Sequence, residues 1–262
     1  MDLKLEGKLA LVSGSTKGIG LAIATELAGE GCRVIVNGRS GQAVLDATAR
    51  IRVRHAAAQL EGIAADLSTA EGVAQVVQRF PDVEVLVNNL GIYERKAFED
   101  IPDADWHRFF DVNVMSGVRL ARAYLPSMKA RNWGRIVFIS SESGIHIPAE
   151  MVHYGVTKTA QLAVSRGIAE TCAGTNVTVN AVLPGPTRSD GVVQAMSRRA
   201  GGRPLAEVEQ EFLRVARPSS LLRRLAEPEE VAHLVAYVCS PLSSATNGAA
   251  LRVDGGVVRA CF

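Results

Sequence analysis

The chain has 262 residues, of which 47% are hydrophobic and 21% are charged, the balance of a folded globular protein rather than of a disordered or fibrous one. A formal net charge of +2 and an aromatic content of 5% give no reason to expect binding to a nucleic acid. No apolar run approaches the roughly 18 residues that are needed to cross a bilayer, so we also expect no insertion into a membrane.

The four cysteines, Cys32, Cys172, Cys239 and Cys261, show neither CxxC pairing nor a histidine at metal-ligand spacing. We therefore expect reduced, buried thiols and no metal site. The N-terminal residues include acidic side chains and lack the long apolar segment of a signal peptide. Together these features predict a cytoplasmic protein.

Short apolar runs rich in β-branched residues alternate along the chain with longer stretches in which apolar residues recur at helical spacing. Strands that are apolar throughout and are separated by helices are typical of a parallel sheet covered on both faces. The pattern therefore predicts an α/β fold in three layers (α/β/α) around a doubly wound parallel sheet. The predicted strands span residues 9–13, 33–37, 62–66, 83–89, 135–140, 177–183 and 250–254.

No linker or internal repeat divides the chain, so we expect one domain over residues 1–262. The least regular stretch, residues 186–228, follows the sixth predicted strand, where an open α/β sheet can carry a loop over its ligand. We expect this stretch to cover the substrate and its basic residues to lie on a solvated helix face.

Residues 13–20 (SGSTKGIG) follow the first predicted strand and open the first helix. Gly14 permits a tight turn, Gly18 lets the backbone approach a phosphate, and Gly20 lets the helix pack closely on the sheet. The backbone N–H groups at the start of the helix then face an anion. The spacing GxxxGxG is weak evidence by itself, but its place between strand and helix favours a dinucleotide site over a purely structural turn.

The residues after the second predicted strand bear on which dinucleotide binds. An acidic residue there would bind the ribose 2′-hydroxyl of NAD, whereas an arginine accommodates the 2′-phosphate of NADP. The sequence has no acid at this place and has Arg39, with Lys17 as a second cation in the glycine turn. Although each could be an ordinary surface charge, their joint position predicts a preference for NADP(H), with NAD(H) as the alternative.

Tyr154 and Lys158 are four residues apart in a predicted helix, so their side chains share a face. A free phenol titrates at about pH 10, and a neighbouring cation lowers that pKa, as a tyrosine acid/base requires. The pair alone is weak evidence, because a solvated lysine near an amphipathic tyrosine is common. Two features strengthen it: Ser141 follows the fifth predicted strand at its carboxyl end, and Asn113 lies in a helical pattern that disfavours asparagine.

With these motifs in order, the whole chain resembles a single-domain short-chain dehydrogenase/reductase with a Rossmann-like fold. Residues 13–20 resemble the TGxxxGxG turn of that family, residues 88–91 resemble its NNAG segment with Leu90 in place of alanine, and Tyr154 with Lys158 resembles its YxxxK pair. The resemblance implies a cofactor site formed by Gly14, Ser15, Thr16, Lys17, Gly18, Ile19, Gly20, Arg39, Asp66, Leu67, Asn88, Gly91, Tyr154, Lys158, Pro184, Gly185, Thr187 and Ser189.

The resemblance also implies a catalytic set of Asn113, Ser141, Tyr154 and Lys158. Hydride would pass between the nicotinamide and a carbonyl carbon while Tyr154 gives or takes the proton. Lys158 would lower the pKa of Tyr154 and bind the nicotinamide ribose, and Ser141 would hold the substrate oxygen. Asn113 would hold a water that connects Lys158 to solvent. We therefore expect an NADP(H)-dependent carbonyl reductase of ketone or 3-oxoacyl type, or an alcohol dehydrogenase.

Two alternatives stay open. One is a non-catalytic dinucleotide-binding regulator or scaffold of the same fold, which would have no need of an intact Ser–Tyr–Lys set. The other is an enzyme with a different outcome, such as epimerisation or enoyl reduction, although the usual tyrosine–lysine spacing of enoyl reductases is longer than four residues. The partner is expected to be a small carbonyl or alcohol compound, and the resemblance implies a homo-oligomer, either a tetramer or a dimer.

Overall fold

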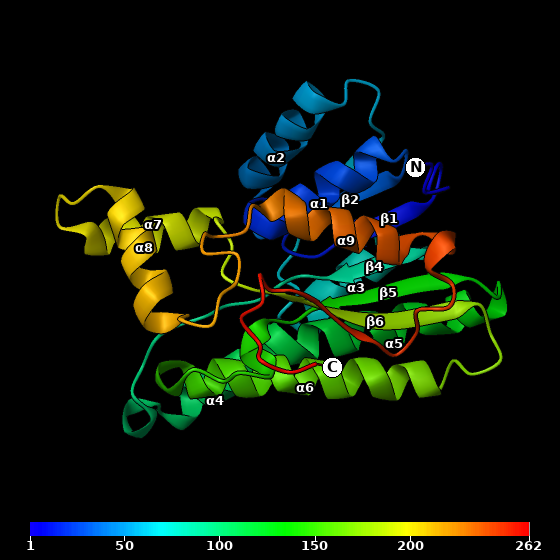
Figure 1. Ribbon diagram of the computed structural model, residues 1–262. Helices are drawn as coiled ribbons and strands as arrows, with labels where there is room; N and C mark the ends of the chain where they lie inside the picture. The colour runs from blue at the N-terminus through cyan, green and yellow to red at the C-terminus, as the bar shows by residue number, and fades with distance from the viewer. Residues whose placement is uncertain (262) are drawn as a thin grey trace.

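Residues 1–261, which the computed structural model describes, form a seven-stranded parallel sheet between two layers of helices (Figure 1). The strand order is β3-β2-β1-β4-β5-β6-β7. Because the chain winds outward from β1 to β3 and then returns to β4, the carboxyl ends of β1 and β4 flank a crevice. The strands are β1 (Leu9–Val12), β2 (Arg33–Gly38), β3 (Leu60–Ala64), β4 (Val85–Asn88), β5 (Gly134–Ile139), β6 (Val177–Pro184) and β7 (Ala250–Val253).

Alternate residues of each strand pack against opposite layers of helices. In β1, Ala10 and Val12 belong to the core under α1, α2 and α9, whereas Leu9 and Leu11 belong to the core over α3, α5 and α6. Since both faces are covered, a strand needs apolar residues at every position, which explains the continuous apolar runs. The helices are α1 (Gly18–Gly29), α2 (Gly41–Arg54), α3 (Ala70–Arg79), α4 (Asp103–Phe110), α5 (Ser116–Ala130), α6 (Val152–Glu170) and α9 (Pro228–Cys239).

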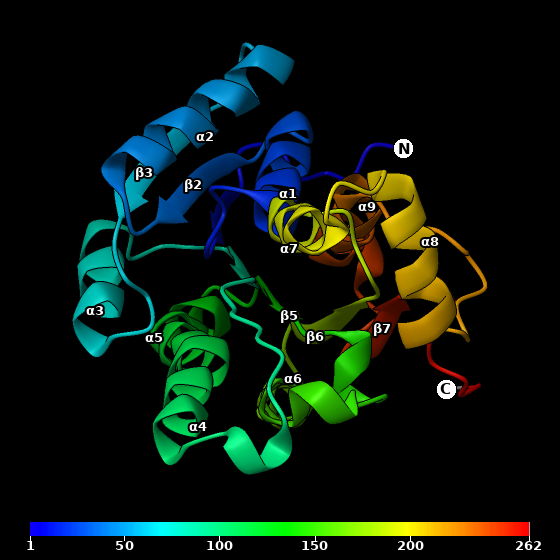
Figure 2. The same cartoon turned by 90° about the vertical axis from the view of Figure 1, so that its left-hand side faces the viewer.

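Two helices, α7 (Asp190–Ala200) and α8 (Leu205–Ala216), stand apart from these layers, off the end of the sheet where the strands finish (Figures 1 and 2). They share a small core of their own around Met196, Leu213 and Leu225. At the start of α7, the Asp190 carboxylate accepts a hydrogen bond of 2.9 Å from the backbone N–H of Gly18. The pair is therefore attached to the glycine turn.

The predicted α/β fold is confirmed, with differences at the ends of elements. β3 begins two residues earlier than predicted because Val34 pairs with Leu60, and Asp66 already accepts the N–H of Ser68 in a turn. β7 ends at Val253, since Asp254 turns the chain. Helix α6 begins at Val152, two residues before Tyr154.

All four cysteines are free thiols. Cys32, Cys172 and Cys239 are buried as predicted, and burial raises the pKa of Cys32 to about 12. Cys261 is exposed, so the prediction of a buried thiol is wrong there. This residue follows the last strand and lies outside the packed layers.

We predict that Gly20→Ala destabilises the protein by about 1–3 kcal/mol, the usual cost of an overpacked site. A Cβ at Gly20 would lie 2.4 Å from Nδ2 of Asn89 and 2.5 Å from the carbonyl oxygen of Gly14. The free energy of unfolding in urea measures the effect. Gly167→Ala is the control, because nothing lies within 4 Å of a Cβ there. Because Gly167 lies inside a helix, its replacement by alanine should raise the free energy of unfolding by about 0.5–1 kcal/mol. Equal effects of the two substitutions would contradict the close packing described here.

Candidate active site

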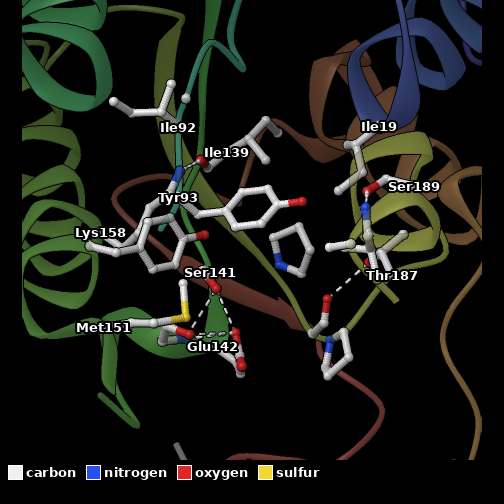
Figure 3. Close-up of a pocket in the computed structure, with 18 of the residues that line it drawn as sticks. Ile19, Ile92, Tyr93, Ile139, Ser141, Glu142, Met151, Lys158, Thr187 and Ser189 are labelled. Atoms are coloured by element: carbon white, nitrogen blue, oxygen red, sulfur yellow. Dashed lines mark hydrogen bonds between the residues drawn. The ribbon is translucent and has the colours of Figure 1, made fainter. Parts of the chain in front are cut away.

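A cavity of about 480 Å³ opens at the carboxyl ends of β4, β5 and β6 (Figure 3), and residues of α7 and α8 also line it. Segments at three strand ends line it: residues 91–95 after β4, residues 139–143 at the end of β5, and residues 184–187 at the end of β6. Helix α6 contributes Tyr154 and Lys158. Parallel strands thus bring segments that are far apart in the sequence to one place.

Lys158 is a buried cation on α6, one turn after Tyr154. Its Nζ lies over the Tyr154 ring, 5.6 Å from the ring centroid. The ammonium donates hydrogen bonds to the carbonyl oxygen of Ile139 at 2.9 Å and to Oε1 of Gln161 at 3.3 Å. Burial lowers the pKa of Lys158 to about 7, because the charged form loses hydration.

The pKa of the Tyr154 phenol is raised. Burial is the main cause and the negative charge of Glu142 is the next, while a hydrogen bond with Ser141 acts in the opposite direction. The expected net lowering of this pKa is therefore not found, because burial outweighs the effect of nearby positive charge. A raised pKa keeps Tyr154 protonated through the neutral range, which is the form that can donate a proton.

Ser141 and Glu142 lie side by side where β5 ends (Figure 3). The Ser141 hydroxyl donates a hydrogen bond to Oε2 of Glu142. The same carboxylate oxygen accepts the backbone N–H of Ser143 at 2.8 Å. Both side chains line the cavity, so the hydroxyl of Ser141 and the phenol of Tyr154 open onto the same space.

Arg217, which follows α8, neutralises Glu142. Its Nε donates to Oε1 of Glu142 at 2.8 Å, and the two side chains are only 8% and 5% exposed. The sequence pattern predicts that the basic residues of 186–228 lie on a solvated helix face. This prediction is wrong for Arg217, whose side chain is buried. The partner is 75 residues away in the chain, so no local pattern pointed to it.

Asn113 lies in a π-helical turn, Asp111–Met115, between α4 and α5. Its Oδ1 accepts the N–H of Ile92 at 2.8 Å, and its Nδ2 donates to the carbonyl of Ile92 at 3.0 Å and to the hydroxyl of Thr157 at 2.9 Å. The side chain therefore ties the segment after β4 to α6. Asn113 lies behind the residues that line the cavity.

The glycine turn is held by Asn89 from the end of β4. Its Nδ2 donates to the carbonyl oxygens of Ser13 and Gly14 at 3.0 and 3.1 Å. The family resemblance implies the neighbouring Asn88 as a cofactor residue, and the structure buries its side chain at the end of β4. Leu90, where the family has alanine, is accommodated by partial burial against the core, and its N–H donates to the Ser13 hydroxyl at 3.0 Å.

The cations predicted to bind a phosphate, Lys17 and Arg39, are both exposed. Arg39 follows β2, and its charge contributes to lowering the pKa of Asp66, although the main cause is the hydrogen bond from the Ser68 hydroxyl. Asn37, which no sequence motif pointed to, accepts the N–H of Gly14 at 3.1 Å through its side-chain oxygen.

The wall of the cavity on the side of α7 and α8 is largely apolar. Val192 and Met196 on α7 and Phe212 on α8 line it, and Ile92 and Met151 add apolar lining from other segments. Two cations, Arg95 and Arg199, also line the cavity, and Arg95 is paired with Glu150 at 2.9 Å.

The predicted site residues thus separate into two groups. The cavity brings together Ile19, Gly91, Ser141, Tyr154, Lys158, Pro184, Gly185, Thr187 and Ser189. The remaining predicted residues do not line it: Gly14, Ser15, Thr16, Lys17, Gly18, Gly20, Arg39, Asp66, Leu67, Asn88 and Asn113.

Known proteins resemble this chain in both sequence and fold. A family model described as enoyl-(acyl carrier protein) reductase matches residues 14–258. The chain is 51% identical to the uncharacterized oxidoreductase YvaG of Bacillus subtilis (strain 168), with 100% of both chains covered. It is 33% identical to the 3-oxoacyl-(acyl-carrier-protein) reductase FabG of Aquifex aeolicus (strain VF5), over 98% of this chain and 100% of the other. The structure of L-sorbose reductase from Gluconobacter frateurii, complexed with NADPH and L-sorbose, matches with a TM-score of 0.93 at 30% identity, covering 99% of this chain and 100% of that one.

The chain therefore belongs to the short-chain dehydrogenase/reductase family, oxidoreductases that act on CH–OH or C=O groups with NAD(P)(H). Within residues 1–261, none of the helices combines the length and the apolar character needed to span a membrane.

We predict that Arg217→Met costs about 3–5 kcal/mol in the free energy of unfolding, because it leaves the buried Glu142 carboxylate without its partner. Adding Glu142→Gln to that variant should recover a large part of the loss. The matched control is Arg166→Met, which breaks an exposed pair with Glu170 in which both side chains are 63% exposed. Its cost should stay below about 1 kcal/mol. Chemical denaturation of the wild type and the three variants measures these values, and a cost for Arg217→Met no larger than that of the control would contradict the buried pair.

Proposed function

We propose that the chain is an NADP(H)-dependent carbonyl reductase, or an alcohol dehydrogenase in the reverse direction. The observation that carries the proposal is that the phenol of Tyr154 and the hydroxyl of Ser141 open onto one cavity in which Lys158 is fixed by hydrogen bonds. Two hydroxyl groups beside one space can both bond a single carbonyl oxygen. Such positioned donors are what proton transfer to a carbonyl requires.

The glycine turn fits a dinucleotide. Gly14 and Gly18 have φ values of +63° and +56°, which other residues rarely adopt. The first turn of α1 carries no acidic residue of its own, and the N–H of Gly18 already pairs with an anion, the Asp190 carboxylate, which a cofactor phosphate would replace. NADP would be held there by its phosphates, with Arg39 on the 2′-phosphate and Asp66 near the adenine. When bound, the nicotinamide supplies or accepts the hydride.

The chain's own residues would handle the proton. In reduction, Tyr154 donates its phenolic proton to the carbonyl oxygen, and in oxidation the phenolate takes a proton from the alcohol. The positive charge of Lys158 stabilises the phenolate that reduction leaves behind. Ser141 holds the substrate oxygen, and to do so its hydroxyl turns from the Glu142 carboxylate to the substrate.

The substrate would be a carbonyl compound with an apolar part, of ketone or 3-oxoacyl type. The apolar side chains of α7 and α8 support this, since they line the same cavity as Ser141 and Tyr154. We propose that residues 186–228 act as the cover over the substrate within a single domain. The likeness to L-sorbose reductase adds keto sugars to the compounds worth testing.

The proposal is tested by following nicotinamide absorbance with NADPH against a panel of ketones, 3-oxoacyl thioesters and keto sugars, with Tyr154→Phe as the variant. Loss of the phenolic proton should lower kcat by about 10²–10⁴-fold while binding of NADPH, measured by fluorescence, stays nearly unchanged. Tyr237→Phe, on the outer side of α9 and 40% exposed, is the control and should keep full activity.

Full turnover by Tyr154→Phe would remove this residue from the mechanism. An enoyl thioester belongs in the same panel, because the matching family model is described as an enoyl reductase. Reduction of that compound alone would replace carbonyl reduction with enoyl reduction. No turnover with any compound, together with tight NADPH binding, would favour the non-catalytic regulator.

The cofactor preference has its own test. Arg39→Ala should raise KM for NADPH about tenfold or more, the effect of losing a charge-assisted hydrogen bond, and leave KM for NADH unchanged. Arg50→Ala, another exposed arginine on the neighbouring α2, controls for a general loss of positive charge. A wild-type preference for NADH, or equal effects of Arg39→Ala on both cofactors, would contradict a role for Arg39 at the 2′-phosphate.

A further inference from the structure

Gln161 is a buried amide on α6, just beyond Lys158. Its side chain is 1% exposed, and both ends of its amide group are bonded. Nε2 donates to the backbone carbonyl oxygen of Asn113 at 2.6 Å, and Oε1 accepts from Nζ of Lys158 at 3.3 Å. The amide therefore links two residues of the predicted catalytic set that are 45 positions apart (158 − 113).

The π-helical turn explains why the carbonyl of Asn113 needs such a partner. A π turn shifts the backbone hydrogen bonds from the i+4 to the i+5 residue, so a carbonyl at the turn can point out of the regular ladder. A buried carbonyl without a donor is costly. The Asn113 side chain is already bonded to Ile92 and Thr157, and the Gln161 amide satisfies the main chain.

We propose that Gln161 is a positioning residue that fixes the ammonium of Lys158, and that its amide takes the place of a water between Lys158 and the carbonyl of Asn113. This inference rests on the proposed role of Lys158. A neutral amide donates only through nitrogen and accepts only through oxygen, so it does not pass a proton along. Proton exchange between Lys158 and solvent would then run through the cavity that Lys158 lines, and not past Asn113.

Two variants separate positioning from packing. Gln161→Leu keeps most of the side-chain volume but removes both hydrogen bonds. Lys158 then keeps only its bond to the Ile139 carbonyl, and the Asn113 carbonyl has no side-chain donor. Gln161→Ala opens a polar space in which a water can bond both groups. We expect kcat to fall about tenfold or more in Gln161→Leu, as for a lost hydrogen bond to a charged group, and Gln161→Ala to recover most of it. A packing role gives the opposite order, with alanine worse than leucine.

The pH dependence is the second measurement. Burial lowers the pKa of Lys158 to about 7, and the phenol of Tyr154 is the titratable group beside it. Removing the acceptor in Gln161→Leu disfavours the ammonium further, so the pKa of Lys158 falls. The alkaline loss of kcat should therefore move to lower pH in this variant and stay in place in Gln161→Ala.

A measurement without cofactor or substrate keeps the two proposals distinct. A lysine whose pKa is lower in the folded state makes the protein more stable as pH rises from the folded to the unfolded value. In Gln161→Leu this rise in the free energy of unfolding should begin at lower pH than in wild type, and in the exposed control Gln78→Leu it should not move.

The proposal is overturned if Gln161→Leu changes neither the pH dependence of the free energy of unfolding nor the pH at which kcat is lost on the alkaline side. It is also overturned if Gln161→Ala lowers kcat more than Gln161→Leu does. If the wild-type chain turns over no carbonyl compound, the proposed function fails instead. The shift of the stability profile then still decides whether Gln161 holds Lys158.

Discussion

Burial of charge is the constraint on which the site depends. Lys158, Glu142 and Arg217 all lie out of water at one end of the sheet, and a buried charge persists only where polar partners surround it. The partners come from separate elements: the last carbonyl of β5 and an amide of α6 hold Lys158, while Arg217, after α8, holds Glu142. The charged groups are therefore satisfied only when β5, α6 and the segment after α8 are all in their folded positions.

The pairing of Glu142 with Arg217 joins the segment after α8 to the residues of the proposed chemistry. Glu142 touches Ser141 and raises the pKa of Tyr154, and Arg217 acts on that pKa in the opposite direction. A displacement of α8 would leave the carboxylate unpaired beside both hydroxyl groups. Since a buried ion pair adds little stability over apolar residues of similar size, its place in the cavity wall is better explained by control of charge at the site.

The sheet order places β1 beside β4, and this brings the glycine turn next to the cavity that holds Tyr154. The glycine turn follows β1, and the segment that reaches Asn113 and Tyr154 follows β4 and β5. Asn89 spans the junction with its hydrogen bonds to the backbone of the glycine turn. The proposed cofactor turn is thereby held beside the cavity by an amide at the end of β4.

The sequence by itself determined the order of strands and helices, the glycine turn and the Tyr154–Lys158 pair, because each is a pattern within a few residues that follows from strand or helix geometry. Only the tertiary structure decided the partners of the buried groups. Arg217 meets Glu142 across 75 residues, Asn89 meets the Ser13 carbonyl across 76, and Gln161 meets Asn113 across 48. No periodicity links such positions, because packing of the sheet and its helices sets their distance. For the same reason the raised pKa of Tyr154 could not be predicted: it depends on burial and on Glu142, which only the folded chain brings to the phenol.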